Sequence, residues 1–346
     1  MAFILPKENT YLIGHEKAEK MFLEAFDKGT MHHALLISGL KGIGKATFAY
    51  KIARFLLQDD FENAPKGKLD ISPSSPVFKQ ICADSNPNFL AIERDYTETD
   101  KKKIIKAIKD GEPLDADSMQ DLKKSAVIKV DEVRQINAFL SKKSFDGAWR
   151  VVLIDSVDEM NASSANALLK ILEEPPEKTM LLLISHQPSK LLPTIKSRCV
   201  KLALEPLVKE NVASLLRRYM PDLKENEVNE LSAICDGSIG KALNYAANNG
   251  LDIYQRLQSV IYARSRFDLN EALALAVRAA SDENVWDLIL ELTLHILSDM
   301  ITSGENVEAL YEVYTLVLRT NSEVIGLNMD KRQALINLFY QISKAV

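Results

Sequence analysis

The sequence predicts a doubly wound α/β domain over residues 1–205, followed by residues with helical character alone. Five short apolar runs alternate with segments of helical periodicity in this first part, the order typical of a parallel sheet covered by helices. A glycine-rich loop follows the first run and opens a helix. That succession of strand, loop and helix is typical of a phosphate-binding loop.

The predicted strands are short apolar runs, as expected of strands buried on both faces of a parallel sheet. They lie at residues 34–37, 88–94, 151–154, 180–184 and 200–204. Apolar residues at helical spacing predict helices at residues 18–26, 48–56, 130–140 and 162–172, with a short helical segment at 191–198. Asn161 is a suitable N-cap for the helix at 162–172, and Pro175 stops it.

Two stretches between these elements have little apolar periodicity. Residues 58–82 combine prolines, serines and mixed charge, which predicts a surface insertion. Residues 97–125 are strongly charged, and we expect a solvated, partly mobile excursion there. The alternative for its lysine run at 101–103 is a patch that binds DNA.

The composition is that of an ordinary globular protein, with 47% hydrophobic and 26% charged residues among 346. A net charge of −5 argues against a surface whose whole field attracts nucleic acid, and a local basic patch stays open. No apolar run approaches the ~20 residues that cross a bilayer, so we expect a cytoplasmic protein. Cys82, Cys199 and Cys235 form no CxxC pair, so we expect reduced thiols and no metal site.

The segment GLKGIGKAT matches the phosphate-loop pattern GxxxxGK[ST] except at its last position. The candidate nucleotide-binding residues in it are Gly39, Gly42, Gly44, Lys45 and Thr47. Glycines let backbone N–H groups surround phosphate oxygens, and the lysine reaches the terminal phosphates. Ala46 stands where Ser or Thr coordinates Mg²⁺, and Thr47 comes one residue late. The alternative is a glycine-rich turn that contains a lysine by chance.

Asp155 ends the buried strand at 151–154, where doubly wound sheets bind ligands. An aspartate at such a strand end commonly holds the Mg²⁺ of a bound nucleotide. The alternative is a carboxylate that caps a helix or stabilises a turn. The phosphate-loop pattern upstream favours the nucleotide site.

Four segments carry a family resemblance: HHALLISGLKGIGKAT, VVLIDSVDEMNASSANALLKILEEPP, LLLISHQPSKLLPTIKSRC and GSIGKAL. With them the chain resembles the delta-prime family of bacterial DNA polymerase III clamp-loader subunits, which are AAA+ proteins. The resemblance covers most of residues 1–204 and part of the next domain. It implies an AAA+ domain at 1–205, a small helical lid at 206–250 and an all-helical oligomerisation collar at 251–346.

The resemblance also bears on whether the chain binds and hydrolyses ATP. In subunits that hydrolyse ATP, a glutamate follows the strand-end aspartate and positions the attacking water, whereas Ser156 follows Asp155 here. With Ala46 as a second departure, we expect no turnover of ATP. The intact Gly44-Lys45 leaves passive binding of ATP or ADP open, in a degenerate site. Lys241 is implied as the lid's contact to nucleotide, and an exposed helix lysine is the alternative. Relatives that carry a zinc module have several cysteines where only Cys82 lies nearby, so we expect no zinc.

Arg198, in the segment SRC, is implied as an arginine finger that acts in trans on ATP held by a neighbouring subunit. An arginine paired with a local carboxylate is the alternative. The implied partners are motor ATPase subunits and the delta subunit in a hetero-pentameric ring, with the sliding clamp and primed DNA reached through the complex. The alternative function is an active AAA+ ATPase that hydrolyses ATP itself.

Overall fold

A computed structural model describes residues 4–58, 67–110, 122–141, 147–263, 267–304 and 306–346. The chain divides into two compact units, a sheet unit that ends at Pro206 and a helical unit from Leu207 to Val346. Within the described ranges, no helix is both long and apolar enough to cross a membrane.

The described part of the sheet unit holds five parallel strands in the order β2-β3-β4-β1-β5. The strands are β1 (Ala34–Ser38), β2 (Phe89–Ile92), β3 (Arg150–Ile154), β4 (Thr179–Ser185) and β5 (Val200–Ala203). Each coincides with a predicted strand to within a few residues, because unbroken apolar runs are the pattern of strands covered on both faces. The predicted doubly wound fold is confirmed.

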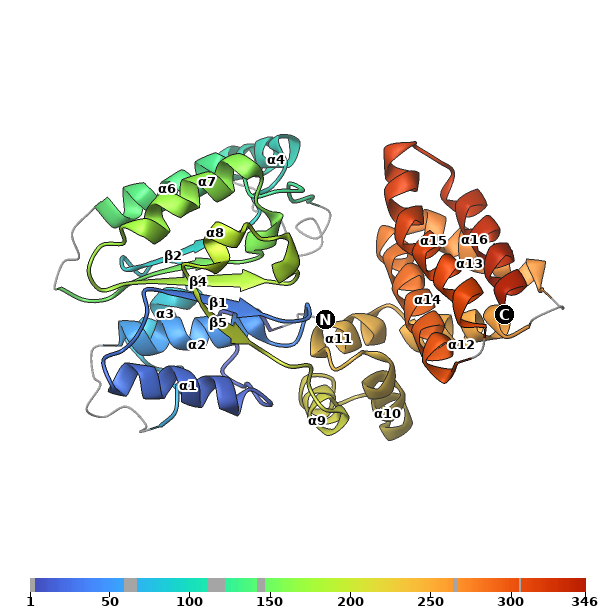
Figure 1. Cartoon of the computed structure of the whole chain (residues 1–346), viewed down its shortest axis with the longest axis horizontal. Coiled ribbons are helices and arrows are strands. Elements are labelled where there is room, and N and C mark those ends of the chain that lie inside the picture. Colours follow the sequence, from blue (N-terminus) through green and yellow to red (C-terminus); the bar gives the residue numbers. More distant parts are fainter. Residues whose placement is uncertain (1–3, 59–66, 111–121, 142–146, 264–266, 305) are drawn as a thin grey trace. The chain divides into compact units, whose positions relative to one another are not determined.

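Helices cover both faces of this sheet (Figure 1). On one side lie α1 (Glu16–Asp27), α2 (Lys45–Leu57) and α3 (Pro76–Cys82). On the other lie α4 (Glu98–Asp110), α6 (Val130–Ser141) and α7 (Ala162–Glu173), and the short helix α8 (Pro193–Lys196) precedes β5. Successive strand residues point to opposite faces, so each strand contributes to both layers.

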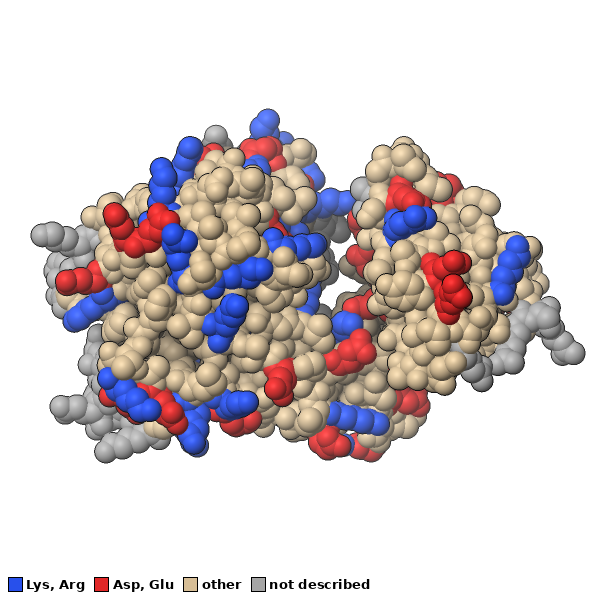
Figure 2. Space-filling view, viewed as in Figure 1, with Lys and Arg blue, Asp and Glu red and all other residues tan. Residues whose placement is uncertain are grey.

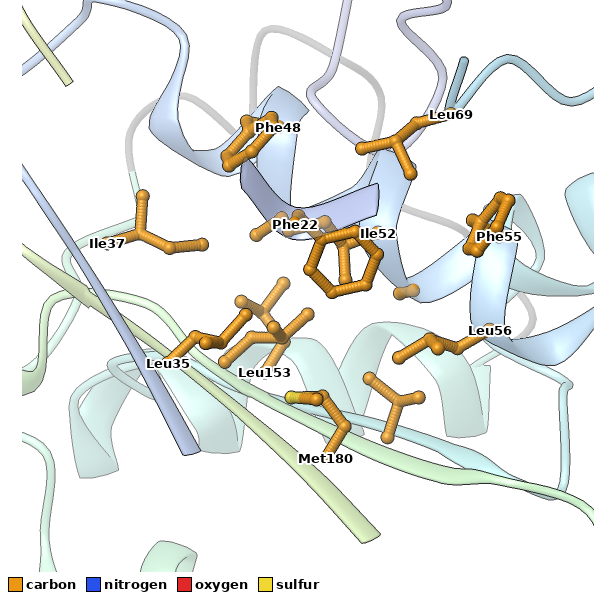
Figure 3. Close-up of a cluster of buried hydrophobic side chains, with 14 of the residues drawn as sticks. Phe22, Leu35, Ile37, Phe48, Ile52, Phe55, Leu56, Leu69, Leu153 and Met180 are labelled. Atoms are coloured by element: carbon orange, nitrogen blue, oxygen red, sulfur yellow. The ribbon is translucent and has the colours of Figure 1, made fainter. Parts of the chain in front are cut away.

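Two apolar cores result from that alternation. Leu35 and Ile37 of β1 join the core under α2, which also contains Phe48 and Ile52 (Figure 3). Leu36, between them in sequence, joins the core under α6 and α7. Burial on both faces holds the strands in one register, which fixes where each of them ends.

Asn161 caps α7 as predicted, and its side chain accepts the Ser164 N–H at 2.9 Å. The Ser164 hydroxyl then donates to the Ile128 carbonyl at 2.8 Å. The helix ends at Glu173, just before Pro175. The turn after β3 is therefore anchored at its far end to the segment before α6.

The prediction of a solvated, partly mobile excursion at 97–125 included no helix, but the first part of this stretch forms α4. Thr97 and Asp100 bond to each other at the start of that helix, because the Thr97 hydroxyl donates to the Asp100 carboxylate at 2.9 Å. Residues 111–121 lie outside the described residues. The insertion predicted at 58–82 likewise ends in a helix, α3, which buries Val77, Phe78 and Ile81. Residues 59–66 lie outside the described residues.

The helical unit contains eight described helices. They are α9 (Lys209–Tyr219), α10 (Glu225–Ile234), α11 (Ile239–Ala247), α12 (Gly250–Ile261), α13 (Leu269–Ser281), α14 (Glu283–Ser303), α15 (Val307–Gly326) and α16 (Lys331–Ala345). Trp286 of α14 is buried and donates from Nε1 to the Asn321 side chain at 3.0 Å. The unit is compact as a whole, so its division into a lid and a collar stays a prediction.

Basic and acidic side chains are both spread over the face of the sheet unit that Figure 2 shows. The lysine and arginine atoms stand singly or in small groups, separated by neutral atoms. This face carries no continuous basic field, consistent with the net charge of −5.

Candidate functional site

The candidate site lies where three neighbouring parallel strands end. β4 lies between β1 and β3 and pairs with both. Because parallel strands run in one direction, the residues after their carboxyl ends meet at the same edge of the sheet. The loop at 39–44 follows β1, Asp155 follows β3 and His186 follows β4. The structure therefore brings together the loop and the carboxylate that the sequence singled out.

Two glycines of the loop are required by close approach as well as by conformation. Gly39 has a φ of +148°, and a Cβ there would lie 2.5 Å from the Leu204 carbonyl oxygen. Gly44 has a φ of +106°, and its Cβ would lie 2.9 Å from the Leu12 side chain. Helix α2 begins at the next residue, so its N-terminus faces the loop. Left-handed backbone at a helix N-terminus is the arrangement that binds anions through N–H groups.

Lys45 is the first residue of α2, and only 3% of it is exposed. Its Nζ donates to the carbonyl oxygens of Gly39 at 2.8 Å and Leu40 at 2.5 Å. Burial lowers the pKa of Lys45 to about 8, although the nearby carboxylates of Asp155 and Asp158 act in the opposite direction. Because its bonded partners are neutral carbonyls, its charge remains available to an anionic ligand.

Asp155 is held by its backbone, since its N–H donates to the Ile92 carbonyl of β2 at 2.9 Å. Burial and the Glu93 carboxylate raise the pKa of Asp155, and Lys45 opposes them. Ser156 follows in a left-handed conformation, with a φ of +63°. The turn after β3 is therefore sharp and points the residues after Asp155 toward the end of β4.

His186, which is not among the site residues predicted from the sequence, closes this turn. Its Nε2 lies 3.1 Å from the Ser156 hydroxyl, and its backbone N–H donates to the Asp158 carboxylate at 2.8 Å. Burial and the positive charge of Lys45 lower the pKa of His186 to about 4. Near neutral pH the ring is therefore uncharged.

A nucleotide phosphate fits the residues at this edge. Two buried polar atoms beside the loop, Ser185 Oγ and His186 Nδ1, have no hydrogen-bond partner within the described part of the chain. Such atoms are rarely left without a partner in a finished site. Ala46 packs partly into the core under α2 and has no hydroxyl for Mg²⁺, while Thr47 is buried one position further along. The assignment of Gly42, Thr47 and the other loop residues to nucleotide stays a prediction.

Lys241 lies in the helical unit, near the start of α11. Its Nζ contacts the carboxylates of Asp236 at 2.9 Å and Glu291 at 3.0 Å. The same Asp236 contacts His295 of α14 at 3.0 Å, and this bond, together with Lys241, lowers the pKa of Asp236 to about 2. In this structure Lys241 joins α11 to α14, and its predicted contact with nucleotide is untested.

Arg198 lies at the opposite edge of the sheet from the phosphate loop. It comes two residues before β5, whereas the loop follows the end of β1. The two edges are separated by roughly 15 Å along the strands. The Arg198 guanidinium contacts Glu173 at 2.7 Å and the Thr194 carbonyl at 3.2 Å. It pairs with a local carboxylate here, and it lies far from the site of its own chain.

The sheet order, with helices on both faces and a helical unit after the sheet, defines the class of this protein, a doubly wound α/β protein of AAA+ type. A sequence profile of the family described as "DNA polymerase III, delta subunit" matches residues 14–208. The chain therefore belongs to that family, and the resemblance to clamp-loader subunits is confirmed.

The relatives agree with this assignment. DNA polymerase III subunit delta' of Pseudomonas aeruginosa is 32% identical over 281 residues, which are 79% of this chain and 74% of the relative. DNA polymerase III subunit gamma of Buchnera aphidicola is 29% identical over 69% of this chain and 57% of its own length. A solved gamma subunit-related protein from Thermotoga maritima covers 95% of this chain and 99% of its own, with 15% identity and a TM-score of 0.41.

Proposed function

We propose that this chain is a clamp-loader subunit of the delta-prime type, which binds nucleotide passively and does not hydrolyse it. In this proposal it works in the cytoplasm within a hetero-pentameric ring of motor ATPase subunits and the delta subunit. The ring loads the sliding clamp onto primed DNA. The helices beyond residue 250 would form the collar that holds the ring together.

We expect no hydrolysis because the two carboxylates that follow Asp155 in the turn after β3 already have partners. Ser156 takes the place of the glutamate found in hydrolysing relatives, and its hydroxyl contacts His186. Asp158 accepts the His186 N–H, and Glu159 forms an ion pair with Arg94 at 2.8 Å. A general base must be free to reach the water it activates. Neither carboxylate is free without breaking a contact that shapes the turn.

Passive binding is expected from the groups that the loop retains. The glycine backbone, the N-terminus of α2 and the buried charge of Lys45 can hold phosphate without metal. The hydroxyl that would coordinate Mg²⁺ directly is missing at Ala46. ADP or ATP should therefore bind with weak dependence on Mg²⁺.

The turnover of the purified chain tests this first part. Incubated with ATP and Mg²⁺, with or without primed DNA, the chain should release no phosphate above background. The double variant Ala46→Thr, Ser156→Glu puts both missing groups back and serves as the comparison. Sustained turnover by the unmodified chain would support the alternative, an active AAA+ ATPase, and would remove the proposal.

The position of Arg198 supports a role in trans. Because Arg198 lies at the far edge of the sheet, it does not reach a nucleotide held by the phosphate loop of its own chain. This position is compatible with contact to a nucleotide held by a neighbouring subunit of a ring. An arginine finger neutralises charge on the γ-phosphate through its planar, permanently charged guanidinium. The contact with Glu173 is partly exposed, and such ion pairs are weak enough for a phosphate to replace.

The assembled complex tests the arginine finger. Arg198→Ala should leave ring assembly intact on gel filtration and lower the ATPase stimulated by DNA and clamp, with Arg198→Lys restoring part of it. Lys196→Ala, a nearby cation on α8, is the matched control and should keep full turnover. A correctly assembled Arg198→Ala complex with unchanged turnover would exclude Arg198 from the mechanism.

A further inference from the structure

His15 lies buried against the phosphate loop, although it comes 28 residues before the loop residue that it contacts. Only 4% of the residue is exposed, and its Nε2 lies 2.7 Å from the Ile43 carbonyl oxygen. A carbonyl oxygen can only accept a hydrogen bond, so Nε2 carries the hydrogen and donates it. The contact is therefore a directed bond from the start of α1 to the backbone of the loop.

The backbone of His15 is held in place at the start of α1. His15 is the N-cap of α1, and its carbonyl accepts the Glu19 N–H at 3.1 Å. The residue before it, Gly14, donates its N–H to the Glu16 carboxylate at 2.8 Å. Helix α1 in turn packs against α2 through Phe22 and Phe55, whose ring centres lie 6.2 Å apart. The side chain therefore extends to the loop from a backbone that these contacts hold in place.

The bond sets the orientation of one peptide group in the loop. The peptide between Ile43 and Gly44 is trans, so its carbonyl and its N–H point to opposite sides. Holding the Ile43 oxygen toward His15 directs the Gly44 N–H away from it. Leu12 and His15 stand so close behind Gly44 that a Cβ would lie 2.9 Å from the Leu12 side chain and 3.6 Å from His15 Nε2. The space behind Gly44 is therefore filled by these two side chains, and there is no room for a Cβ.

We propose that His15 is a positioning residue of the phosphate loop, which fixes the Ile43–Gly44 peptide so that the Gly44 N–H donates to a phosphate oxygen of the bound nucleotide. The inference rests on the nucleotide binding proposed above. It adds a residue from outside the loop motif, and that residue acts through the backbone without touching the ligand. Phosphate loops bind through such N–H groups, so the orientation of one of them bears directly on affinity.

The test compares three variants with the unmodified chain by calorimetry with ADP. His15→Phe keeps a ring of similar size and removes the donor, and it should weaken ADP binding about tenfold, the factor given by one hydrogen bond of ordinary strength. His15→Gln keeps an N–H donor at nearly the same reach and should bind ADP like the unmodified chain. His33→Phe is the matched control, because His33 also contacts a backbone carbonyl, that of Leu172 at 3.1 Å, before β1 begins. It should leave ADP affinity unchanged.

A second measurement keeps the role of His15 separate from nucleotide binding itself. The amide signal of Gly44 in a nitrogen–proton NMR spectrum, recorded without nucleotide, should shift in His15→Phe and stay in place in His15→Gln and His33→Phe. If the unmodified chain binds no ADP, the proposal of passive nucleotide binding is wrong. The spectrum still shows whether His15 orients the Ile43–Gly44 peptide. A folded His15→Phe chain with unchanged ADP affinity and an unchanged Gly44 signal would overturn the inference.

Should His15→Phe fail to fold, as judged by its melting curve, His15→Asn takes its place. Its amide is too short to reach Ile43, and the side chain stays polar. It should reproduce the weaker ADP binding and the shifted Gly44 signal, and native behaviour in both measurements would equally overturn the inference.

Discussion

Two lysines, one in each unit, are held in opposite ways. Lys45 donates to the carbonyl oxygens of Gly39 and Leu40, and burial lowers its pKa to about 8. Lys241 lies between the carboxylates of Asp236 and Glu291. Burial also acts to lower the pKa of Lys241, but its bonds to these carboxylates outweigh burial and raise it.

The difference between the partners of the two lysines indicates which positive charge is available to a ligand. The direct hydrogen-bond partners of Lys45 are neutral carbonyl groups, and the nearby carboxylates of Asp155 and Asp158 offset its charge only in part, so a phosphate can neutralise it. Two carboxylates already neutralise Lys241, and a nucleotide would have to replace both. The first lysine has the surroundings of a binding group, and the second has those of a structural link between α11 and α14.

The largest effect is expected from removing the available charge. Lys45→Met should weaken ADP binding about 100-fold, because a charge-assisted bond to phosphate is lost. The melting temperature should change little, because relief of the cost of burying the amine is offset by the loss of its attraction to Asp155 and Asp158. Calorimetry and thermal unfolding measure the two. ADP affinity equal to that of the unmodified chain would contradict the role of Lys45.

Removing the neutralised charge of Lys241 should lower stability and leave ADP affinity unchanged. Lys241→Met removes the cation shared by Asp236 and Glu291 and leaves only His295 beside Asp236, so the free energy of unfolding should fall by about 1–3 kcal/mol. Denaturant unfolding measures this, with Lys241→Arg as the control that keeps the charge. A stable variant that loses ADP affinity as Lys45→Met does would instead support the nucleotide contact that the family resemblance implies.

The pH dependence of ADP binding sharpens the comparison further. With a pKa of about 8, Lys45 loses its proton as the pH rises through that value, whereas the raised pKa of Lys241 keeps it charged. Titration of Lys45 should therefore leave ADP affinity unchanged below pH 7 and lower it by up to about tenfold per pH unit above 8. Calorimetry in buffers of different ionisation enthalpy should also detect proton uptake on binding above pH 8. Affinity that stays flat to pH 9.5 would exclude titration of Lys45.

The smallest effect concerns stability, where two histidines should act in opposite directions. Burial lowers the pKa of His186 to about 4, so the unfolded chain binds more protons and stability is lost as the pH falls from 6.5 to 4. The bond to Asp236 raises the pKa of His295, so its contribution is complete below pH 6.5 and is lost as the pH rises through the raised value. Melting curves at pH 5, 6.5 and 8 measure these contributions. Relative to the unmodified chain, His186→Gln should lose less stability as the pH falls to 5, and His295→Gln should lose less as the pH rises to 8. Parallel shifts in the two variants would contradict this assignment.

The strands and the loop could be predicted because their signals are local. An unbroken apolar run such as Val151–Ile154 is stable only where both faces are covered, and a glycine-rich loop between strand and helix has few other uses. Helix α4 was missed because its charged residues outweighed its apolar ones. Its start was present in the sequence, since Thr97 followed three residues later by Asp100 is a helix-capping pattern.

By itself, the sequence determined the strands and the glycine-rich loop between β1 and α2, because each depends on neighbours within a few positions. The roles of that loop and of Asp155 in binding nucleotide stay predictions, as does the effect of Ala46 and Ser156. Tertiary structure decided how the polar groups pair. His15 meets Ile43 across 28 residues, His186 meets Ser156 across 30, and Lys241 meets Glu291 on another helix. The physical reason is that periodicity sets which face of an element is buried. Only the packing of elements decides which polar atom is close enough to donate, to accept or to neutralise a charge.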